Sequence, residues 1–405
     1  ARATLRPLRP NVRVPQGQTH PDPRPGRRAV SGGPSSGCGS FPGTYRYPRT
    51  HRRTCYLSQS ARGGRGESAH GTSDPARRNR CGRETRRPNQ AGEPAPLRGR
   101  FLTFDTQNLS PETAGQQKEY RQSILAKTSP RDLVRIILRQ PIIRLSETQI
   151  NTGLKAEYSE NPVMNLFYTR DQLITTAKGV VIGRMNSPQR EKGCDILQFC
   201  LEKIGMKPLH RIDGEGAHLE GGDFYPFGDT AFIGCGMRTT QPAIDQLMEH
   251  DLLGCNRLVV VKDRLFSQAE MHLDTYFNII DRNLVTLTAR RMTTDPDSPD
   301  LLLADIYLRG ANGVYTKTEE DVGFIELLRS RIGAAIIPIS EEDADRLAGN
   351  FLTVGSRRII GVAGQSEALR TELKHRGVKV TWVGLDNLCK GYGAAHCMTQ
   401  VLRRR

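Results

Sequence analysis

The hydrophobic and polar positions of residues 166–383 follow one pattern that repeats along the chain. Each copy begins with two short apolar segments joined by a turn, which predicts a β-hairpin. An amphipathic segment with helical spacing follows, and a Val- or Ile-rich segment then predicts one further strand. The copies, written as hairpin, helix and strand, are 166–185, 191–204 and 206–212; 223–235, 242–253 and 257–262; 275–287, 319–332 and 334–339; and 350–362, 366–376 and 378–383.

This repetition predicts a mixed α/β fold in which modules surround a common centre, and not a doubly wound sheet. Each copy has one face that it cannot bury by itself, so neighbouring copies must cover one another. Residues 289–318 do not fit the pattern and are predicted to form an irregular insertion. In residues 101–160 only a helix at 132–138, ahead of Pro141, is predicted. We expect one catalytic domain over residues 101–405.

Residues 1–100 differ from the rest of the chain in composition. They contain 21 arginines, no lysine and five acidic residues, so their formal charge equals the +16 of the whole chain. They are rich in Pro, Gly and Ser and lack apolar periodicity, which predicts a disordered tail. Three interpretations stay open: a transit peptide, a basic arm for nucleic acid, or a gene-model artefact without function. The rest of the chain is neutral, so we expect no nucleic-acid partner for it.

The sequence also bears on the cellular compartment. No segment approaches the ~18 consecutive apolar residues of a membrane span, so no membrane association is expected. The nine cysteines are scattered and form no CxxC pair, which argues against a disulfide framework or a structural zinc site. We therefore expect a reducing compartment, the cytoplasm, or a mitochondrion or plastid if the tail is a transit peptide.

Two clusters that combine histidine and carboxylates directly precede predicted hairpins. Glu220 and Asp223 flank a Gly pair, which lets both carboxylates face one pocket and bind a cation. The alternative is a turn in which Asp223 binds local backbone N–H groups. His272 and Asp274 are predicted to share one face of an extended segment, where the carboxylate orients the histidine for general acid–base work. A histidine with a structural hydrogen bond is the alternative there.

A nucleophile and one further acid complete the candidate chemistry. Cys397 follows a run of glycine and alanine that suits an exposed nucleophile, although most free cysteines are buried and inert. Asp171 follows an apolar run; a solvated surface pair with Arg170 is the alternative. The histidines His218 and His272 and the acids of both clusters could bind a metal, but no HxxxH or HExxH spacing is present, so we expect none. Loops from different modules can therefore converge on a Cys/His/acid site.

Four of these segments together resemble the arginine deiminase family of guanidino-group-modifying enzymes. They are residues 165–171, 218–223, 272–275 and 391–397, and the resemblance covers about residues 160–405. It implies a five-module, pentein-like α/β propeller. It also implies hydrolysis of L-arginine to L-citrulline and ammonia through a covalent S-alkylthiouronium on Cys397, without a cofactor. The implied partner is a small guanidine, and formation of a homo-oligomer stays open.

The resemblance implies a role for each site residue. Cys397 is the nucleophile, His272 the general acid and base, Glu220 its support, and Asp171 and Asp274 hold the guanidinium nitrogens. The implied substrate-binding residues are Asn165, Arg190, Arg238, Asp223 and Tyr392.

Tyr392 departs from the family pattern, because many members have there an arginine that contacts the substrate carboxylate. Three alternatives therefore stay open. They are deimination of agmatine or a methylated arginine, transfer of the amidino group to an amine, and arginine binding without catalysis.

Overall fold

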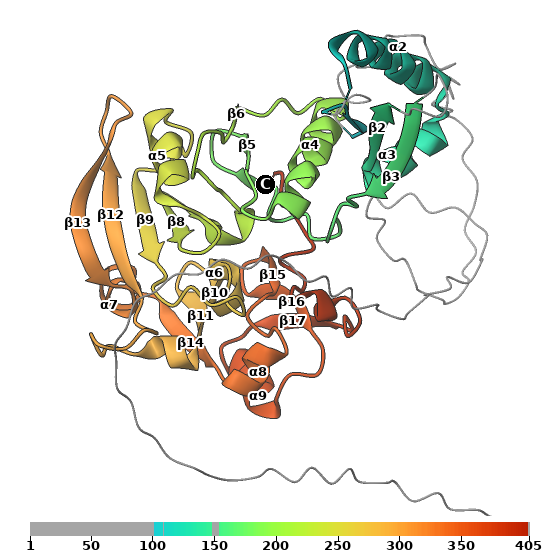
Figure 1. Cartoon of the computed structure of the whole chain (residues 1–405). Helices are drawn as coiled ribbons and strands as arrows, with labels where there is room; N and C mark the ends of the chain where they lie inside the picture. The colour runs from blue at the N-terminus through green and yellow to red at the C-terminus, as the bar shows by residue number, and fades with distance from the viewer. Residues whose placement is uncertain (1–100, 108, 148–153, 404–405) are drawn as a thin grey trace, which may run out of the picture. The chain divides into compact units, whose positions relative to one another are not determined.

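The computed structural model describes residues 101–403, except for residue 108 and residues 148–153. The predicted tail lies outside the described residues. Five small sheets occupy the described part of the chain (Figure 1). Their strands are β1 (Thr103–Asp105), β2 (Pro141–Glu147), β3 (Leu154–Glu160), β4 (Leu173–Thr175), β5 (Val180–Ile182), β6 (His210–Arg211), β7 (Phe224–Phe227), β8 (Thr230–Cys235), β9 (Arg257–Lys262), β10 (Phe277–Asp281), β11 (Leu284–Thr288), β12 (Leu303–Arg309), β13 (Tyr315–Gly323), β14 (Ala335–Ile339), β15 (Leu352–Gly355), β16 (Arg358–Val362) and β17 (Lys379–Val383).

Helices connect these strands. The α-helices are α2 (Pro111–Lys127), α3 (Pro130–Arg139), α4 (Pro188–Lys203), α5 (Gln241–Glu249), α6 (Leu273–Tyr276), α7 (Phe324–Glu326), α8 (Glu341–Asp345) and α9 (Glu367–His375). Short 3₁₀ turns are η1 (Gly221–Asp223), η2 (Ala289–Met292) and η4 (Cys389–Gly391), and η3 (Leu327–Arg331) is a π-helical turn. None of the helices among these described residues combines the length and the apolar character that crossing a membrane requires.

The predicted repeat is confirmed in four of the five sheets. In the second copy, β7 and β8 form an antiparallel hairpin, and β9 returns parallel to β8 after α5. The sheets β4-β5-β6, β10-β11-β14 and β15-β16-β17 have the same sequence of antiparallel and parallel pairs. The fifth sheet, β1-β2-β3, is also mixed, with β1 parallel and β3 antiparallel to β2. The predicted mixed α/β fold with five modules is thus confirmed.

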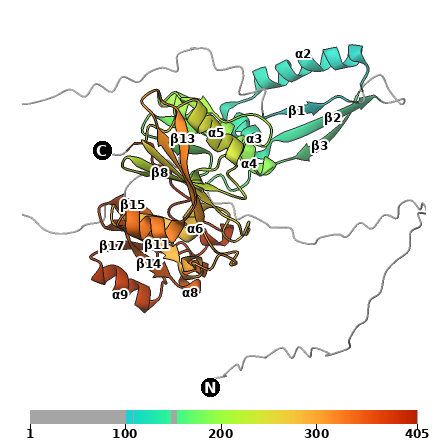
Figure 2. The same ribbon diagram turned by 90° about the vertical axis from the view of Figure 1, so that its left-hand side faces the viewer.

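Apolar side chains of neighbouring modules form shared clusters of buried residues. Phe232 of β8 and Val259 of β9 pack in one cluster with Phe277 of β10 and Phe324 of α7. The Phe232 and Phe277 ring centroids are 5.6 Å apart. Helix α9 lies against β17 and β14, next to the sheet β15-β16-β17 in both views (Figures 1 and 2). This packing fixes the strands, and therefore the loops that lead into them.

The prediction of an irregular insertion at residues 289–318 is wrong. Strand β12 pairs antiparallel with β9, and β13 pairs with β12, so the second sheet has five strands, ordered β13-β12-β9-β8-β7. Asp305 interrupts the apolar pattern of β12, yet it is buried, because Lys262 Nζ lies 2.6 Å and Lys317 Nζ 3.0 Å from its oxygens. These long-range ion pairs have no local sequence signal.

Two further differences concern helices. The helix predicted at 319–332 begins only at Phe324, because the preceding residues extend β13, and its second half is the π turn η3. In residues 101–160 the predicted helix is present as α3, but α2 and the sheet β1-β2-β3 were not predicted. Strand β3 is exposed at residues 155–160, so its sequence carries no one-sided apolar alternation.

Candidate active site

The candidate residues lie on the segments that lead into the first strand of four sheets. Asp171 precedes β4, Glu220 precedes β7 through η1, and His272 precedes β10 through α6. Asn350 precedes β15 in the same way. Cys397 comes from the C-terminal segment, and its backbone oxygen accepts a hydrogen bond from Arg170 N at 3.1 Å. The predicted convergence of loops from different modules is therefore present.

His272 and Asp274 do not share a strand face, so that prediction is wrong. His272 has extended backbone angles, but Leu273–Tyr276 form the single turn of helix α6. The cause is distant in sequence: Asp223 Oδ1 accepts a hydrogen bond from Leu273 N at 2.8 Å, as an N-terminal cap does. Asp223 Oδ2 also accepts one from Thr239 Oγ1 at 2.6 Å. Asp223, predicted to bind substrate, thus holds the start of the helix that carries Asp274.

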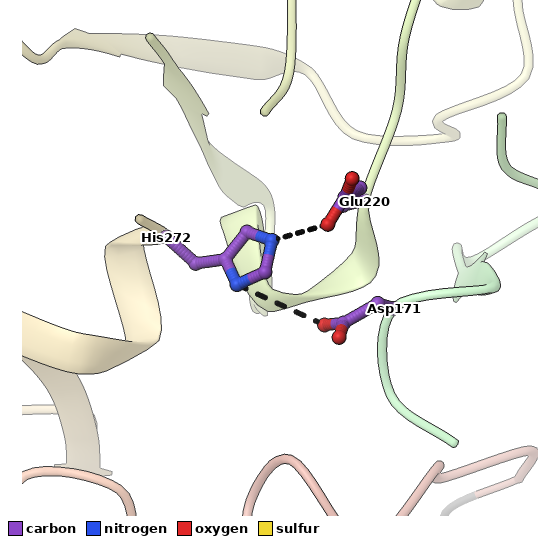
Figure 3. A group of neighbouring side chains, drawn as sticks. All are labelled: Asp171, Glu220 and His272. Carbon is purple, nitrogen blue, oxygen red and sulfur yellow. Dashed lines mark hydrogen bonds and ion pairs between the residues drawn. The ribbon is translucent and has the colours of Figure 1, made fainter. Parts of the chain in front are cut away.

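His272 lies between two carboxylates (Figure 3). Its Nε2 is 2.7 Å from Glu220 Oε2, and its Nδ1 is 3.9 Å from Asp171 Oδ1. Burial opposes protonation of the imidazole, but the charges of Asp171, Glu220 and Asp223 outweigh it and raise the pKa of His272 to about 10. The imidazole is therefore a proton donor at neutral pH.

The carboxylate of Glu220 is completely buried and surrounded by donors. Burial favours its neutral form, but the hydrogen bond to His272 and the charges of His272, Arg238 and Arg190 outweigh that effect and lower the pKa of Glu220. Arg238 Nη1 lies 3.6 Å from Glu220 Oε1, and the backbone N of Asn186 donates to the same oxygen at 3.0 Å. Glu220 is thus an ionised partner that fixes the imidazole ring.

Arg190 contacts the acids of the site directly. Its Nη1 donates to Asp171 Oδ2 at 2.7 Å and lies 3.9 Å from Glu220 Oε2, and its Nη2 donates to the backbone oxygen of Tyr168 at 3.3 Å. Arg190 and Asp171 are both buried, so the alternative of a solvated surface acid at Asp171 is wrong. A guanidinium group from the chain itself therefore binds the carboxylate that was predicted to hold a guanidine.

Cys397 is buried beside Asp274. Its Sγ lies 3.4 Å from Asp274 Oδ2, and His396 Nδ1 lies 2.7 Å from the same oxygen. Burial and the negative charges of Asp274 and Asp171 raise the pKa of the Cys397 thiol well above its ordinary value, whereas a hydrogen bond from Asn350 acts in the opposite direction. Burial and the charge of Arg170 lower the pKa of His396 to about 4, so His396 is neutral.

Two glycines allow the reactive side chains their positions. A Cβ atom on Gly222 would lie 2.9 Å from His272 Cγ, and one on Gly393 would lie 2.9 Å from Cys397 Cβ. Both distances are too short for a real contact, so the glycines of these motifs are required by close approach to the catalytic candidates.

Two predicted substrate-binding residues stay apart from this cluster. Asn165 is half-buried with a positive φ of 53°, and no described contact joins its side chain to Asp171, His272 or Cys397. Tyr392 is 74% exposed and also has a positive φ, 67°. A large cavity of about 590 Å³ is lined by Arg170, His396 and residues of several hairpins, but not by Cys397 or His272.

Asp171, Glu220 and His272 could also bind a metal ion by geometry. One ligand atom from each lies within 4.8 Å of the others. Arg190 and Arg238 already place positive charge on these acids, and the protonated His272 carries a hydrogen on both ring nitrogens, so neither can bind a metal. This donor set therefore suits a protonated histidine and guanidinium groups better than a divalent cation.

A search against family models matches residues 103–404 to the arginine deiminase family. The chain belongs to the arginine deiminase family. Among curated members, the arginine deiminase of Halobacterium salinarum is 27% identical, over 60% of this chain and 65% of that relative. That of Metamycoplasma arthritidis is 26% identical, over 75% of this chain and 76% of the relative.

Solved structures with a similar fold are more distant from this arginine deiminase family member. Dimethylarginine dimethylaminohydrolase from Pseudomonas aeruginosa, in complex with citrulline, is 20% identical with a TM-score of 0.41, over 57% of this chain and 74% of that chain. The N-terminal domain of a cyanobacterial arginine dihydrolase, bound to product, is 19% identical with a TM-score of 0.46, over 72% and 86% of the two chains.

Two buried residues that contact the segment of Cys397 in this family member were not identified from the sequence. Arg170 donates through Nε to the His396 backbone oxygen at 3.1 Å and through Nη1 to Gln400 at 3.2 Å. Asn350 contacts Cys397 and Asp274. The position of Asn350 in the repeat could have identified it, because Asn350 directly precedes a hairpin, as Glu220 and His272 do.

Proposed function

We propose that this protein hydrolyses L-arginine to L-citrulline and ammonia, with Cys397 as the nucleophile. One observation carries the proposal. Asp171 Oδ1 and Asp274 Oδ1 are buried carboxylate oxygens from two different modules, and neither has a hydrogen-bond partner among the described residues. Both carboxylates act on the Cys397 sulfur electrostatically. A planar cation with several N–H donors, placed between them, would satisfy both oxygens and lie next to the sulfur.

The first half-reaction uses this arrangement. A guanidinium is stabilised by resonance, so two fixed carboxylates in a buried site help to localise its charge on the nitrogens. The same positive charge offsets the repulsion that Asp171 and Asp274 exert on a Cys397 thiolate, so binding of the substrate favours ionisation of the thiol, and the thiol proton passes to solvent because His272 already carries one. The thiolate sulfur adds to the guanidinium carbon and forms a tetrahedral species. That species expels ammonia when His272 transfers a proton to the leaving nitrogen.

The second half-reaction releases the product. His272, neutral after its proton transfer, removes a proton from a water molecule that attacks the S-alkylthiouronium carbon. Collapse of the second tetrahedral species breaks the carbon–sulfur bond and forms the ureido carbonyl, the hydroxyl proton passes to the departing sulfur and restores the Cys397 thiol, and citrulline leaves with the oxygen of that water. Glu220, 2.7 Å from His272 Nε2, holds the ring in one orientation in both steps. No other group need supply electrons or protons.

The decisive experiment measures citrulline and ammonia from purified protein and L-arginine. We expect both products in equal amounts, and their absence would reject the proposal. Cys397→Ser is expected to lose turnover, whereas Cys235→Ser, which removes another cysteine that is half-buried, is expected to keep it. Loss of activity in both variants would assign the effect to the fold instead of the nucleophile.

A second guanidine is the main alternative substrate. The side chain of Tyr392 is 74% exposed and does not provide the carboxylate contact expected from an arginine at this position. Agmatine lacks that carboxylate, so it would lose nothing by this replacement. The specificity constants for the two substrates decide: a preference for arginine above about tenfold, the effect of one charge-assisted contact supplied by another residue, would disfavour agmatine.

A further inference from the structure

Asn350 is a buried residue, 1% exposed, that connects the nucleophile segment to Asp274. Its Oδ1 accepts hydrogen bonds from Ala394 N at 2.9 Å and from Cys397 N at 3.2 Å. Its Nδ2 lies 3.1 Å from the Asp274 backbone oxygen and 3.1 Å from Cys397 Sγ. Its own backbone oxygen accepts from His396 N at 3.1 Å. The Asn350 side chain thus contacts both the sulfur and the backbone N–H of Cys397.

These contacts determine which way the amide points. Two backbone N–H groups can bond only to the amide oxygen, and the Asp274 carbonyl can accept only from the amide nitrogen. The second N–H of that nitrogen is therefore directed to the sulfur. A hydrogen bond donated to sulfur stabilises the thiolate more than the thiol, because the acceptor then carries a full charge.

The charges around the sulfur make this donor matter. Asp274 Oδ2, 3.4 Å from Sγ, repels a thiolate, and so does Asp171. The charges of Arg170 and Arg190 favour a thiolate at a distance, and the Asn350 amide is the donor described in direct contact with the sulfur. The acids that suit a guanidinium therefore work against the nucleophile, and the Asn350 donor offsets part of that repulsion through its contact with the sulfur.

We propose that Asn350 is a catalytic residue, which donates a hydrogen bond to the Cys397 thiolate and holds residues 394–397 in the geometry for attack. The part about catalysis rests on the proposed function. The part about the thiolate does not, because the ionisation of Cys397 can be measured with a small neutral electrophile. The two parts can therefore fail separately.

The test follows alkylation of Cys397 by iodoacetamide across a range of pH. Trypsin releases residues 391–403 as one peptide, in which Cys397 is the single cysteine, so mass spectrometry reports this thiol by itself. Asn350→Asp keeps the size of the side chain but replaces the donor with an oxygen and adds a carboxylate beside the sulfur, so both changes disfavour the thiolate. We expect alkylation near neutral pH to slow by roughly ten- to a hundredfold, the value of a hydrogen bond to a charged group, and the pH profile to move upward.

Asn278→Asp is the matched control. Asn278 is equally buried and its Nδ2 donates to the backbone oxygens of Gly349 and Phe351, on both sides of Asn350, at 2.8 Å each. This variant disturbs the same segment but leaves the donor to sulfur in place, so we expect its alkylation profile to stay that of the wild type. An equal shift in both variants would show that Asn350 acts only as a structural brace, and an unshifted Asn350→Asp would overturn the proposal.

A measurement on the unmodified chain covers the case in which Asn350→Asp does not fold. In ¹⁵N-labelled protein, the side-chain amide signal of Asn350 should shift when Cys397 is alkylated or ionised, and that of Asn278 should not. No shift at Asn350 would refute the hydrogen bond. If the shift is present but the protein makes no citrulline from arginine, the proposed function fails and the hydrogen bond stands.

Discussion

Replacing Asp171 by asparagine should change two properties of the site in opposite directions. The carboxylate is 3% exposed, lies 3.9 Å from His272 Nδ1, and repels a thiolate at Cys397. Asparagine keeps the shape and an oxygen that can still accept from Arg190, so the substitution removes mainly the charge. At ~4 Å and an effective dielectric constant of ~20, one such charge is worth about 4 kcal/mol, and neighbouring charges shift pKa values by about 1–3 units.

We expect the pKa of Cys397 to fall by about one unit in Asp171→Asn, since the carboxylate is one of two that repel the sulfur. Iodoacetamide, which carries no charge, should then alkylate Cys397 about tenfold faster near neutral pH. A guanidine loses a charged acceptor, so binding of arginine should weaken by roughly ten- to a hundredfold. The assay combines the peptide-specific alkylation rate with citrulline formation.

Measuring the alkylation rate and citrulline formation together distinguishes the loss of one charge from a distortion of the site. A distorted site would lower both rates, whereas loss of one charge should raise one rate and lower the other. Asp213→Asn, which removes an exposed carboxylate, serves as the control and should change neither. Alkylation that is slower than in the wild type, or unchanged, would refute the assigned repulsion between Asp171 and the sulfur.

Three further outcomes test other parts of the structure. Cys397→Ser should lose turnover but still bind arginine, as calorimetry can show; unchanged kcat would remove Cys397 from the mechanism. Arg291 is fully buried between Asp263 and Glu270, so Arg291→Met should lower the free energy of unfolding by about 3–5 kcal/mol in urea titrations; a loss below about 1 kcal/mol would contradict this. Burial raises the pKa of Asp223 to about 7. The folded state prefers protonated Asp223, so its contribution to the free energy of unfolding is full below about pH 4 and is lost as pH rises through 7, by about 4 kcal/mol at most. Asp223→Asn should remove this dependence of stability on pH. Identical curves of stability against pH for the variant and the wild type would argue against it.

The strands of the repeat could be predicted because their information is local. Residues 257–262 are predicted as a strand and form β9 with the same bounds, since a Val-rich run fits a fully buried strand. The hairpin predicted at residues 275–287 is likewise present, as strands β10 and β11. Strand β12 was missed because its buried Asp305 depends on lysines from two other strands.

The site could be predicted only in its parts. The acids, the histidine and the cysteine of the site could be identified as candidates from the sequence, because each lies at the start of a module or in a segment of small residues. Their pairing was not identifiable, because Asp223 is 50 residues from the helix it caps, and Arg190 contacts an acid from a different element. The predictions that Arg190 and Asp223 bind substrate therefore stay predictions. In the structure Arg190 contacts Asp171, and Asp223 contacts the backbone of Leu273.

The ion pair between Arg190 and Asp171 affects how selective recognition can work. In the proposed reaction an incoming guanidine meets an Asp171 carboxylate whose Oδ2 is already bound to Arg190 and whose Oδ1 has no hydrogen-bond partner in the described part of the chain, so the ion pair offsets part of the Coulombic gain of binding. Selectivity among guanidines then depends on the planarity and length of the ligand and on the fit of its remaining N–H groups. Binding to this buried site should depend only weakly on ionic strength.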